Sequence, residues 1–540
     1  MPFADGCAIT RNPLGLLLLL TVLCLMYASW RVIAYPRFAS PLRHLPQPPG
    51  CHWLTGHGQA LFRDGPGICA RKWYATAGHI QAALIPFRIQ DMKHNGMIRA
   101  MWPFGKECVV LLSPAAISEV LVQKGELFEK SYHVRVFAER VIGNGLLLAE
   151  GPQHKMQRRH LTPAFGFRKL KELLPIIEKK AKESVEQMRD DCAATADGRI
   201  SKDLFPWASR CSLDIIGLAG FSLDFGAIRN KNSPLVSLYR TALSQTQTDR
   251  LLMIMAMFFP GWLVRFLPFS RNTEIRLAKA NIRQICQDTL LERISQHESD
   301  GKKSDDILST AMQCGNFSDN DIVNQMMNFL AAGHETTASA LTWAVHLLAM
   351  HRSLQDQLRQ DIMSYSSSSS PSNNRPPIHV DEIPLLWAVC EESLRVCSPV
   401  AQTTRVALFD VHIQGQLIPK GTLLYLVPWA TNVDSALWGP DANDFNPYRW
   451  LQPLGTDQKQ WRRSDKKRWS NYAYMTFSHG RHNCIGQSFA RKELAFLLFA
   501  WVRAFTFELV EPQASEADVD AMIVTRMRRG THVRFSPVPE

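Results

Sequence analysis

The sequence predicts a mostly α-helical fold with a minor β-sheet region, preceded by one N-terminal transmembrane helix. Long helical patterns dominate residues 112–350, and short β-like stretches occur near 80–111, at 406–413, at 421–427 and near 505–537. An uncharged apolar run lies close to the N-terminus. No repeat occurs at the periods of solenoids or propellers, so we expect one large domain after this run.

The composition is that of a folded chain with a large core. The 540 residues are 46% hydrophobic and 20% charged, which excludes a wholly disordered or collagen-like chain. The excess of 12 basic residues suits an anionic membrane surface, an acidic protein partner or a nucleic acid. Because these residues are spread along the chain without a long basic tail, we expect no nucleic-acid partner. The 12 cysteines are too dilute for a disulfide scaffold, and no Cys-x-x-Cys pair suggests a zinc ribbon.

The apolar run is interpreted as a membrane anchor. Between Arg11 and Arg31 lie 19 residues without a formal charge, enough for a helix of ~28 Å, close to one bilayer core. A cleaved signal peptide is the alternative, but the run is long for one and ends on a poor cleavage site. More basic residues follow the run than precede it, which places the bulk of the chain in the cytosol. We predict four segments: a short lumenal N-terminus (1–13), the transmembrane anchor (14–35), a proline-rich hinge (36–50) and a single large domain (51–540).

A long helix is expected in the middle of the chain. Residues 318–321 form a capping-box-like start, and no proline follows until beyond His351, so the helix would measure ~45 Å. In its middle, His334-Glu335 resembles the start of a zinc-protease motif, but residue 338 is alanine where that motif needs a second histidine. A patch of small residues remains beside Glu335 and two hydroxyls. It leaves room either for a ligand or for close packing of another helix, and a threonine there can bond back to a carbonyl and bend the helix.

An acid and a base are spaced to pair on a second helix, expected over residues 384–396. Glu392 and Arg395 are three positions apart and share one helix face. An exposed pair of this kind contributes little to stability. Arg449, further along the chain, could complete a buried network of two arginines and one carboxylate.

The sharpest feature is a glycine-punctuated loop, residues 477–486, that contains Cys484 and precedes an apolar helix expected over 487–505. The helix N-terminus and the nearby Arg481 both favour a thiolate. A lone thiolate can be a nucleophile or an axial metal ligand. His482 is too close in sequence to be assigned as the base that a nucleophile needs. Flanking glycines suit a flat macrocycle that approaches the backbone closely, and a buried structural cysteine is the remaining alternative.

Taken together, these motifs resemble the cytochrome P-450 family of haem-thiolate monooxygenases. They occur in the order and at the spacings of that family, and the resemblance covers residues 14–540. The anchor and hinge resemble those of microsomal members, and the chain as a whole resembles filamentous-fungal enzymes of secondary metabolism or fatty-acid oxidation. The matching positions are Phe477, Gly480, Cys484 and Gly486 of the haem loop, Ala332 to Thr337 of the oxygen-activation pattern, and Glu392, Arg395 and Arg449.

Two positions depart from the family pattern. In the haem loop the family's arginine position holds His482, with Arg481 just before it, so either residue could contact a haem propionate. In the helix that usually carries Trp-x-x-x-Arg, His154 replaces the tryptophan and Arg158 keeps the arginine position. Arg405 lies where family members hold another propionate.

The resemblance implies haem b with Cys484 as the axial ligand of the iron, held in residues 51–540. Glu335 and Thr336 would organise water for proton delivery. Glu392, Arg395 and Arg449 would be structural. Substrate contacts would come from residues around 127–148, 205–265, 398–403 and 521–527.

The implied reaction inserts one oxygen atom of O2 into a lipophilic substrate, by hydroxylation or epoxidation, in the metabolism of a terpenoid, polyketide or similar compound. Electrons would come from NADPH through a cytochrome P-450 reductase, with cytochrome b5 as a further candidate donor. The implied location is the endoplasmic reticulum membrane, with a cytosolic catalytic domain. Two alternatives stay open: a haem-thiolate isomerase or dehydratase that needs no reductase, and a haem-binding protein without turnover.

A basic run, residues 459–468, contains six cations and one acid. It lies between Arg449 and the cysteine loop, so it is expected near the thiolate-bearing face of the haem. It is either a solvated insertion loop or a patch that attracts an acidic electron donor.

Overall fold

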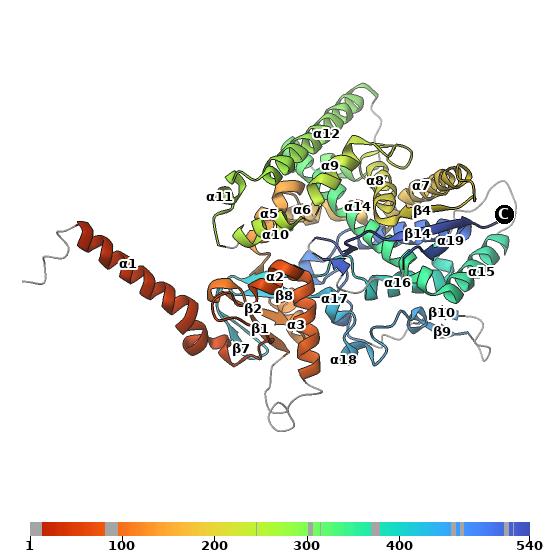
Figure 1. Ribbon diagram of the computed structural model, residues 1–540. Helices are drawn as coiled ribbons and strands as arrows, with labels where there is room; N and C mark the ends of the chain where they lie inside the picture. Colours follow the sequence, from red (N-terminus) through yellow and green to blue (C-terminus); the bar gives the residue numbers. More distant parts are fainter. Residues whose placement is uncertain are drawn as a thin grey trace, which may run out of the picture.

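The computed structural model describes residues 13–539 apart from 81–95, 245, 257, 301–305, 314, 369–378, 455–460, 465–468, 512–517 and 522. A large helical body lies beside a smaller β-rich region, and one helix projects from the molecule (Figure 1). The predicted fold class, mostly α with minor sheets, is confirmed.

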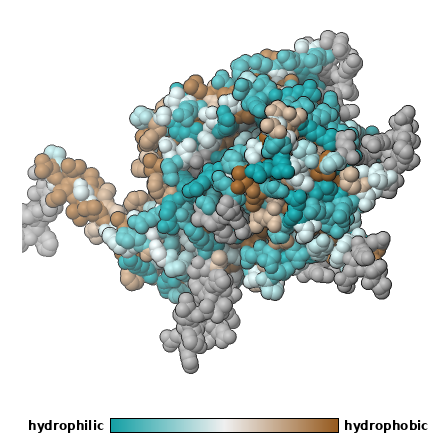
Figure 2. Space-filling model, turned by 45° about the vertical axis from the view of Figure 1, so that its right-hand side comes forward, coloured by the Kyte–Doolittle hydropathy of each residue, from teal (hydrophilic) through white to brown (hydrophobic). Residues whose placement is uncertain are grey.

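The projecting helix is the predicted anchor. Helix α1 (Pro13–Ser29) continues as a π-helix, η2 (Trp30–Ala39), and together they are long and apolar enough to cross a membrane. Its side chains form an apolar rod outside the body (Figure 2). The proline-rich segment that follows is docked on the β-rich region, because Ser40 donates to Glu107 and Gln416 donates to the Pro41 carbonyl.

A five-stranded sheet forms the centre of the β-rich region. Its strand order is β1-β2-β8-β5-β3, and all neighbours are antiparallel except β2 and β8. The alternation of side chains along β1, β2 and β8 gives each face an apolar layer. One layer packs on α2 (Gly58–Asp64) and α3 (Pro66–Ile80), and the other packs on α4 (Pro114–Ser118). The strands are β1 (Met97–Met101), β2 (Glu107–Leu111), β3 (Phe128–Glu129), β5 (Thr403–Ala407) and β8 (Leu423–Leu426).

The remaining strands form small sheets, of which β6 with β7 lies in the β-rich region (Figure 1). A three-stranded sheet consists of β11 (Phe505–Leu509), β14 (His532–Pro537) and β4 (Ile200–Asp203). Three two-stranded sheets consist of β6 (Val411–Ile413) with β7 (Gln416–Ile418), β9 (Leu451–Pro453) with β10 (Trp461–Arg463), and β12 (Val519–Asp520) with β13 (Arg526–Met527).

Helix α14 (Asp319–Met350) runs through the middle of the body (Figure 1). The predicted capping box is confirmed: the Ser318 hydroxyl accepts from the Asp321 N–H, and the Asp321 carboxylate accepts from the Ser318 N–H. The other helices are α5 (Tyr132–Ile142), α6 (Gly151–Leu161), α7 (Phe167–Ala193), α8 (Leu204–Phe221), α9 (Pro234–Leu243), α10 (Gln247–Ala256), α11 (Gly261–Phe266), α12 (Ser270–Asp300), α13 (Ile307–Gln313), α15 (Arg352–Ser368), α16 (Pro384–Val396), α17 (Pro428–Thr431), α18 (Ser435–Trp438) and α19 (Gln487–Ala504).

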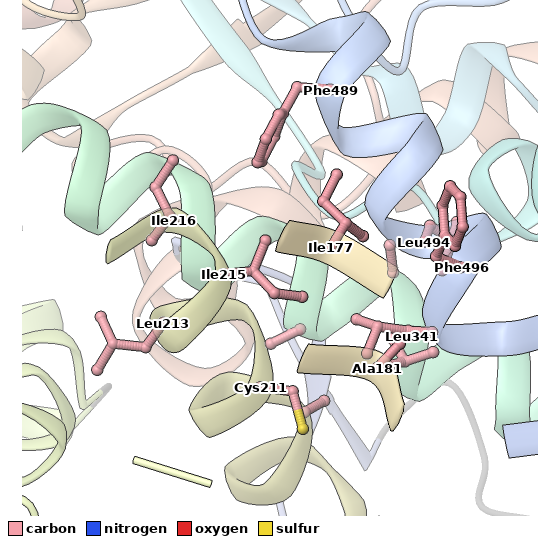
Figure 3. Close-up of a cluster of buried hydrophobic side chains, with 14 of the residues drawn as sticks. Ile177, Ala181, Cys211, Leu213, Ile215, Ile216, Leu341, Phe489, Leu494 and Phe496 are labelled. Atoms are coloured by element: carbon pink, nitrogen blue, oxygen red, sulfur yellow. The ribbon is translucent and has the colours of Figure 1, made fainter. Parts of the chain in front are cut away.

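Four helices, α14 among them, supply the central core. Figure 3 shows apolar side chains from α7, α8, α14 and α19 meeting in one layer, among them Ile177, Ile215, Leu341 and Phe496. All four are buried. The helix that follows the cysteine loop is therefore fixed against α14 through a continuous apolar contact.

Gly333 is a point of close approach between α14 and α8. A Cβ atom at this position would lie 2.9 Å from Cγ1 of Ile216 on α8. The small-residue patch was open to two interpretations, a ligand gap or helix packing. At Gly333 the structure supports helix packing, because a side chain of the protein fills the gap.

Gly333→Ala is expected to lower the stability of the protein, because overpacking a core costs ~1–3 kcal/mol, more than the ~1 kcal/mol that alanine gains over glycine in a helix. In an Ile216→Ala background the sign should reverse, because the gap is then empty. Thermal unfolding midpoints of the single and double variants test this coupling. Gly220→Ala on α8, where a Cβ meets only ordinary contacts at 3.9 Å, is the control. Additive effects of the two substitutions would contradict the packing argument.

Candidate functional site

The cysteine loop is held in shape by its own backbone and by one neighbouring helix. The Cys484 N–H donates to the Phe477 carbonyl, 2.9 Å away, and closes the loop. Gly480 has a φ of +72°, and a Cβ there would lie 2.0 Å from the Leu121 carbonyl oxygen in η5 (Glu119–Gln123). From the sequence, the loop glycines were expected to let a flat ligand approach the backbone closely. Gly480 instead allows the loop to pack on η5.

Cys484 is one of two exposed cysteines among those that the structure describes, and the other, Cys24, lies on the anchor helix. Burial by the surrounding protein raises the pKa of the Cys484 thiol, against the lowering by the Gly486 N–H and the Arg158 guanidinium. The helix terminus favours a thiolate, so burial shifts the pKa in the direction opposite to that expectation. Coordination to a metal cation would reverse it, because a metal deprotonates a thiol outright.

One face of α14 is open in the middle of an otherwise buried helix. Ala332 and Thr336, one turn apart, are partly exposed on this face, whereas Gly333, although also partly exposed, lies against Ile216 of α8, and Glu335 and Thr337 are buried. The Thr336 hydroxyl donates to the Ala332 carbonyl at 2.7 Å, the back-bond that threonine makes within a helix. Its oxygen lone pairs are left to accept a further hydrogen bond from a bound molecule.

Glu335 is buried beside this open face. One carboxylate oxygen lies 3.4 Å from Nε2 of His334, whose Nδ1 is bonded to the Leu330 carbonyl. The other oxygen, Oε2, is buried without a hydrogen-bond partner in the described part of the chain. Leaving a buried polar group unpaired costs ~1–3 kcal/mol, so this oxygen marks a place where a water molecule is favoured.

A cluster of charged groups joins the cysteine loop to the start of α6. His482 Nε2 lies 3.1 Å from the Glu150 carboxylate, and Lys130 Nζ lies 3.0 Å from His482 Nδ1 and 3.3 Å from Glu150. The rings of His154 and His482 lie with centroids 3.9 Å apart. Burial, together with the neighbouring His482 and the Lys130 cation, lowers the pKa of His154 to about 3, so His154 is neutral. Although burial opposes it, the hydrogen bond from His482 lowers the pKa of Glu150 to about 2.

Two arginines complete this cluster, and a third, Arg481, lies near Arg405. Arg158 donates to the carbonyl and to the side-chain oxygen of Asn483, at 2.6 and 2.7 Å, and so links α6 to the cysteine loop. Arg405 on β5 is buried and donates to the Thr404 carbonyl, and it makes no ion pair within the described residues. Burial lowers its pKa to about 10. Arg481 is exposed and points toward Gly125.

Lys130 and Glu150 are residues of this cluster that sequence reasoning missed. Burial lowers the pKa of Lys130 to about 8, against the attraction of Glu150, so it remains a cation at neutral pH. Lys130 follows a two-residue strand, β3, and is separated from His482 by 352 positions. No motif spacing connects residues so far apart, and only the fold brings them together.

Glu392 is the centre of a second, fully buried network. Both of its oxygens accept from Arg395 at 2.8 Å, and Arg449 donates to one of them at 2.8 Å. Trp450 and the Asn446 N–H donate to the same carboxylate. The side chains of Glu392 and Arg395 have no exposed area. The network fastens α16 to η9 (Pro447–Trp450), the segment that leads toward the cysteine loop.

Two segments predicted to contact substrate meet at Thr525. Its N–H donates to the Pro399 carbonyl and its hydroxyl donates to the Ser398 carbonyl, which joins residues 398–403 to residues 521–527. Met522 lies outside the described residues. The other two predicted substrate segments also touch, because Gly261 of α11 lies against Val136 of α5.

The basic run is described only in part, because 455–460 and 465–468 lie outside the described residues. Its described cations, Arg462 and Arg463, lie on β10. Arg463 pairs with Asp381 and lies over the Trp387 ring at 4.6 Å. The charge of Arg463 is therefore partly paired within the protein, which leaves less of it to attract an acidic partner.

Comparison with known proteins places these sites in a family. The model of the family described as Cytochrome P450 matches residues 79–533. The chain belongs to the cytochrome P450 family. It is 36% identical to cytochrome P450 monooxygenase sphH of Aspergillus fumigatus, over 99% of this chain and 96% of the relative. It is 34% identical to cytochrome P450 monooxygenase FUM15 of Gibberella moniliformis and 33% identical to cytochrome P450 monooxygenase ALT8 of Alternaria alternata, over 94% of this chain and 90% of each relative.

The expectation that the chain is an enzyme, a cytochrome P450 monooxygenase, is thereby confirmed. Membership of the family implies a haem cofactor, O2, a lipophilic substrate and a redox partner. The charges of the site fit such a cofactor. Lys130 and Arg405 act on the Glu150 carboxylate, Arg158 lies near His154, and Arg481 lies near Arg405, so cations outnumber carboxylates here, and the propionates of a haem would offset the excess.

Glu392→Ala is expected to destabilise the protein by ~3–5 kcal/mol, because it leaves two buried arginines without their counter-charge. We expect little folded, haem-loaded protein and a lower urea midpoint in what remains. Glu172→Ala on α7 is the control, since Glu172 pairs with Arg168 at the surface and exposed pairs contribute at most ~1 kcal/mol. Normal yield and stability of the Glu392 variant would show that the network is dispensable.

Proposed function

We propose that the chain is a haem b-dependent monooxygenase that inserts one oxygen atom of O2 into a lipophilic compound of fungal secondary metabolism, by hydroxylation or epoxidation. The observation that carries the proposal is Cys484, a solvent-reached cysteine beside a buried excess of positive charge. A haem with a thiolate ligand supplies the activation of O2 when bound. The residues of the chain hold the haem, position the substrate and deliver protons.

In this proposal Cys484 would hold the haem iron through its thiolate, and cations of the Glu150 cluster would hold the propionates. Arg158 and Arg405 supply permanent charge, and Lys130 adds a third cation. Of the two neighbouring candidates, His482 is favoured over Arg481, because His482 contacts Glu150 and Lys130 directly, whereas Arg481 is exposed and acts on the cluster through its charge near Arg405. His154, neutral and in ring contact with His482, contributes packing to that side.

Proton delivery is assigned to Glu335 and Thr336. The unpaired Glu335 Oε2 can accept a hydrogen bond from a water molecule. The Thr336 oxygen can accept a further hydrogen bond, because the Thr336 hydroxyl already donates its proton to the Ala332 carbonyl. Glu392, Arg395 and Arg449 are assigned a structural role. NADPH–cytochrome P450 reductase is proposed as the electron donor, with cytochrome b5 as a second source.

The proposed location is the endoplasmic reticulum membrane, with the catalytic domain in the cytosol. The apolar anchor supports it, and so does the surface next to the anchor. Gly105, in the β1–β2 turn, lies against the Val32 backbone of η2. The neighbouring Phe104 packs edge-on against Phe258, with ring centroids 5.2 Å apart. Exposed aromatic side chains continue from there onto α11, including Trp262 (63% exposed) and Phe266 (81%). Apolar side chains line the edge of the body nearest the anchor (Figure 2).

Cys484→Ser is expected to abolish the thiolate-type ferrous–CO absorbance spectrum, because a serine oxygen cannot supply the thiolate ligand. The spectrum is recorded on detergent-solubilised protein after dithionite reduction. Cys24→Ser, which changes the exposed cysteine of the anchor helix, should leave the spectrum intact. Survival of the spectrum in the Cys484 variant would overturn the ligand assignment and, with it, the proposed function.

Thr336→Ala is expected to uncouple NADPH consumption from product formation while haem content stays normal. Electrons would then leave as hydrogen peroxide, since the hydrogen-bonding group at the open face of α14 is lost. The measurement compares NADPH, peroxide and product with reductase and a verified substrate. Thr342→Ala is the control, because Thr342 makes the same back-bond to Ala338 but is buried. Equal coupling in both variants would remove Thr336 from the proton path.

A further inference from the structure

The buried residue Thr525 connects α14 through hydrogen bonds to two turns, one at Ser398 and Pro399 and one at Thr525 itself. Its carbonyl accepts from the Ser339 hydroxyl at 2.7 Å and from Trp343 Nε1 at 3.2 Å, and its hydroxyl oxygen lies 3.1 Å from the same indole nitrogen. The Thr525 hydroxyl donates to the Ser398 carbonyl at 2.9 Å, and its N–H donates to the Pro399 carbonyl at 2.8 Å. Every polar atom of Thr525 is therefore bonded, and we call Thr525, Ser339, Trp343 and Ser398 the clamp.

The clamp begins where the open face of α14 ends. An α-helix has ~3.6 residues per turn, so Trp343, seven residues after Thr336, returns to the same side of the helix. Thr336 is partly exposed, whereas Ser339 and Trp343 are buried by the two turns. The position of these turns therefore sets how much of the Thr336 face is left open.

The two turns carry partly exposed apolar residues next to the clamp. Val400 follows Pro399, and its carbonyl accepts from the Ser398 hydroxyl at 3.1 Å. Ile523 lies two residues before Thr525 and is also partly exposed. A shift of the clamp would move both side chains relative to Thr336, because the hydrogen bonds run through the backbone of the turns.

The far side of the clamp is braced by the β-rich region. Trp343 packs with Ala401 and Ala521 in one apolar cluster. A Cβ at Gly67 on α3 would lie 2.3 Å from the Ala521 carbonyl oxygen, so α3 is pressed against the turn. The two turns are thus packed against the β-rich region on one side and hydrogen-bonded to α14 on the other.

We propose that Ser339, Trp343 and Thr525 are positioning residues that fix Val400 and Ile523 at the edge of the Thr336 face and so select among large substrates. This inference rests on the proposed function for the identity of the site. The clamp residues are not assigned contact with the reacting atoms, so they act through the turns that they hold.

The variants Ser339→Ala and Thr525→Val each remove clamp hydrogen bonds with little change in shape, and Trp343→Phe removes the indole bonds together with part of a buried side chain. Two controls lose equivalent bonds elsewhere: Trp501→Phe loses the indole bond to Ser184, and Thr342→Val loses the back-bond to Ala338. Spectral titration of the purified holoenzyme compares ketoconazole, which is large enough to reach the turns, with imidazole, which is not.

We expect the clamp variants to bind ketoconazole roughly threefold to tenfold more weakly, the equivalent of one lost hydrogen bond, with imidazole affinity unchanged. Hydrogen exchange should accelerate in peptides covering 397–403 and 523–527 and stay unchanged in the cysteine loop. The controls should match the wild type in both measurements.

Equal weakening for both ligands, or no weakening for either, would overturn the positioning role. Loss of folding in all three clamp variants with intact controls would also overturn it, because the clamp would then be an element of stability. Absence of a thiolate-type ferrous–CO spectrum in the wild type would overturn the proposed function without testing the clamp. The exchange measurement would still decide whether the clamp orders the two turns.

Discussion

Glu392 has no exposed area, and its two oxygens accept hydrogen bonds from Arg395, Arg449, Trp450 and the Asn446 backbone. A carboxylate removed from water is tolerated only when paired and fully hydrogen-bonded. This requirement fixes where α16 lies relative to η9, and η9 begins the stretch of chain that leads to the cysteine loop. The path of the chain toward the cysteine loop therefore starts from a pairing made between α16 and η9.

The Glu150 cluster follows the same rule but is not balanced within the chain. Lys130, Arg158 and Arg405 gather near one carboxylate, and Arg405 is buried without an ion pair among the described residues. Burial lowers the pKa of Lys130 to about 8, which leaves it charged at neutral pH, and lowers that of His154 to about 3, which leaves it neutral. The Glu392 network is balanced within the described chain, whereas the Glu150 cluster keeps an excess of positive charge. We propose that this difference separates residues that hold the fold from residues that hold the haem.

Sequence reasoning was strongest where a signal is local. The capping box at Ser318 and the helix after the cysteine loop depend on neighbouring residues, and both occur in the structure where expected. It could not resolve the glycines, because a sequence does not say which neighbour fills the space of a missing side chain. Gly333 accommodates Ile216, which is one of the two interpretations left open there, and Gly480 accommodates the Leu121 carbonyl. It could not connect Lys130 with His482, or Thr525 with Ser339 and Ser398, because these partners lie more than a hundred positions apart.

Helix α14 shows why one segment can carry a sequence motif and still have several separate tasks. Gly333 faces α8, Thr336 lies on the open side, and Ser339 with Trp343 holds the two turns beyond it. Because these residues lie on different parts of the helix surface, a change at each position should act on a different property. Packing responds at Gly333, and proton delivery responds at Thr336. The shape of the space offered to a substrate responds at Ser339 and Trp343. A helix that is buried on most sides keeps these tasks in fixed register, since a rotation that improved one contact would break the others.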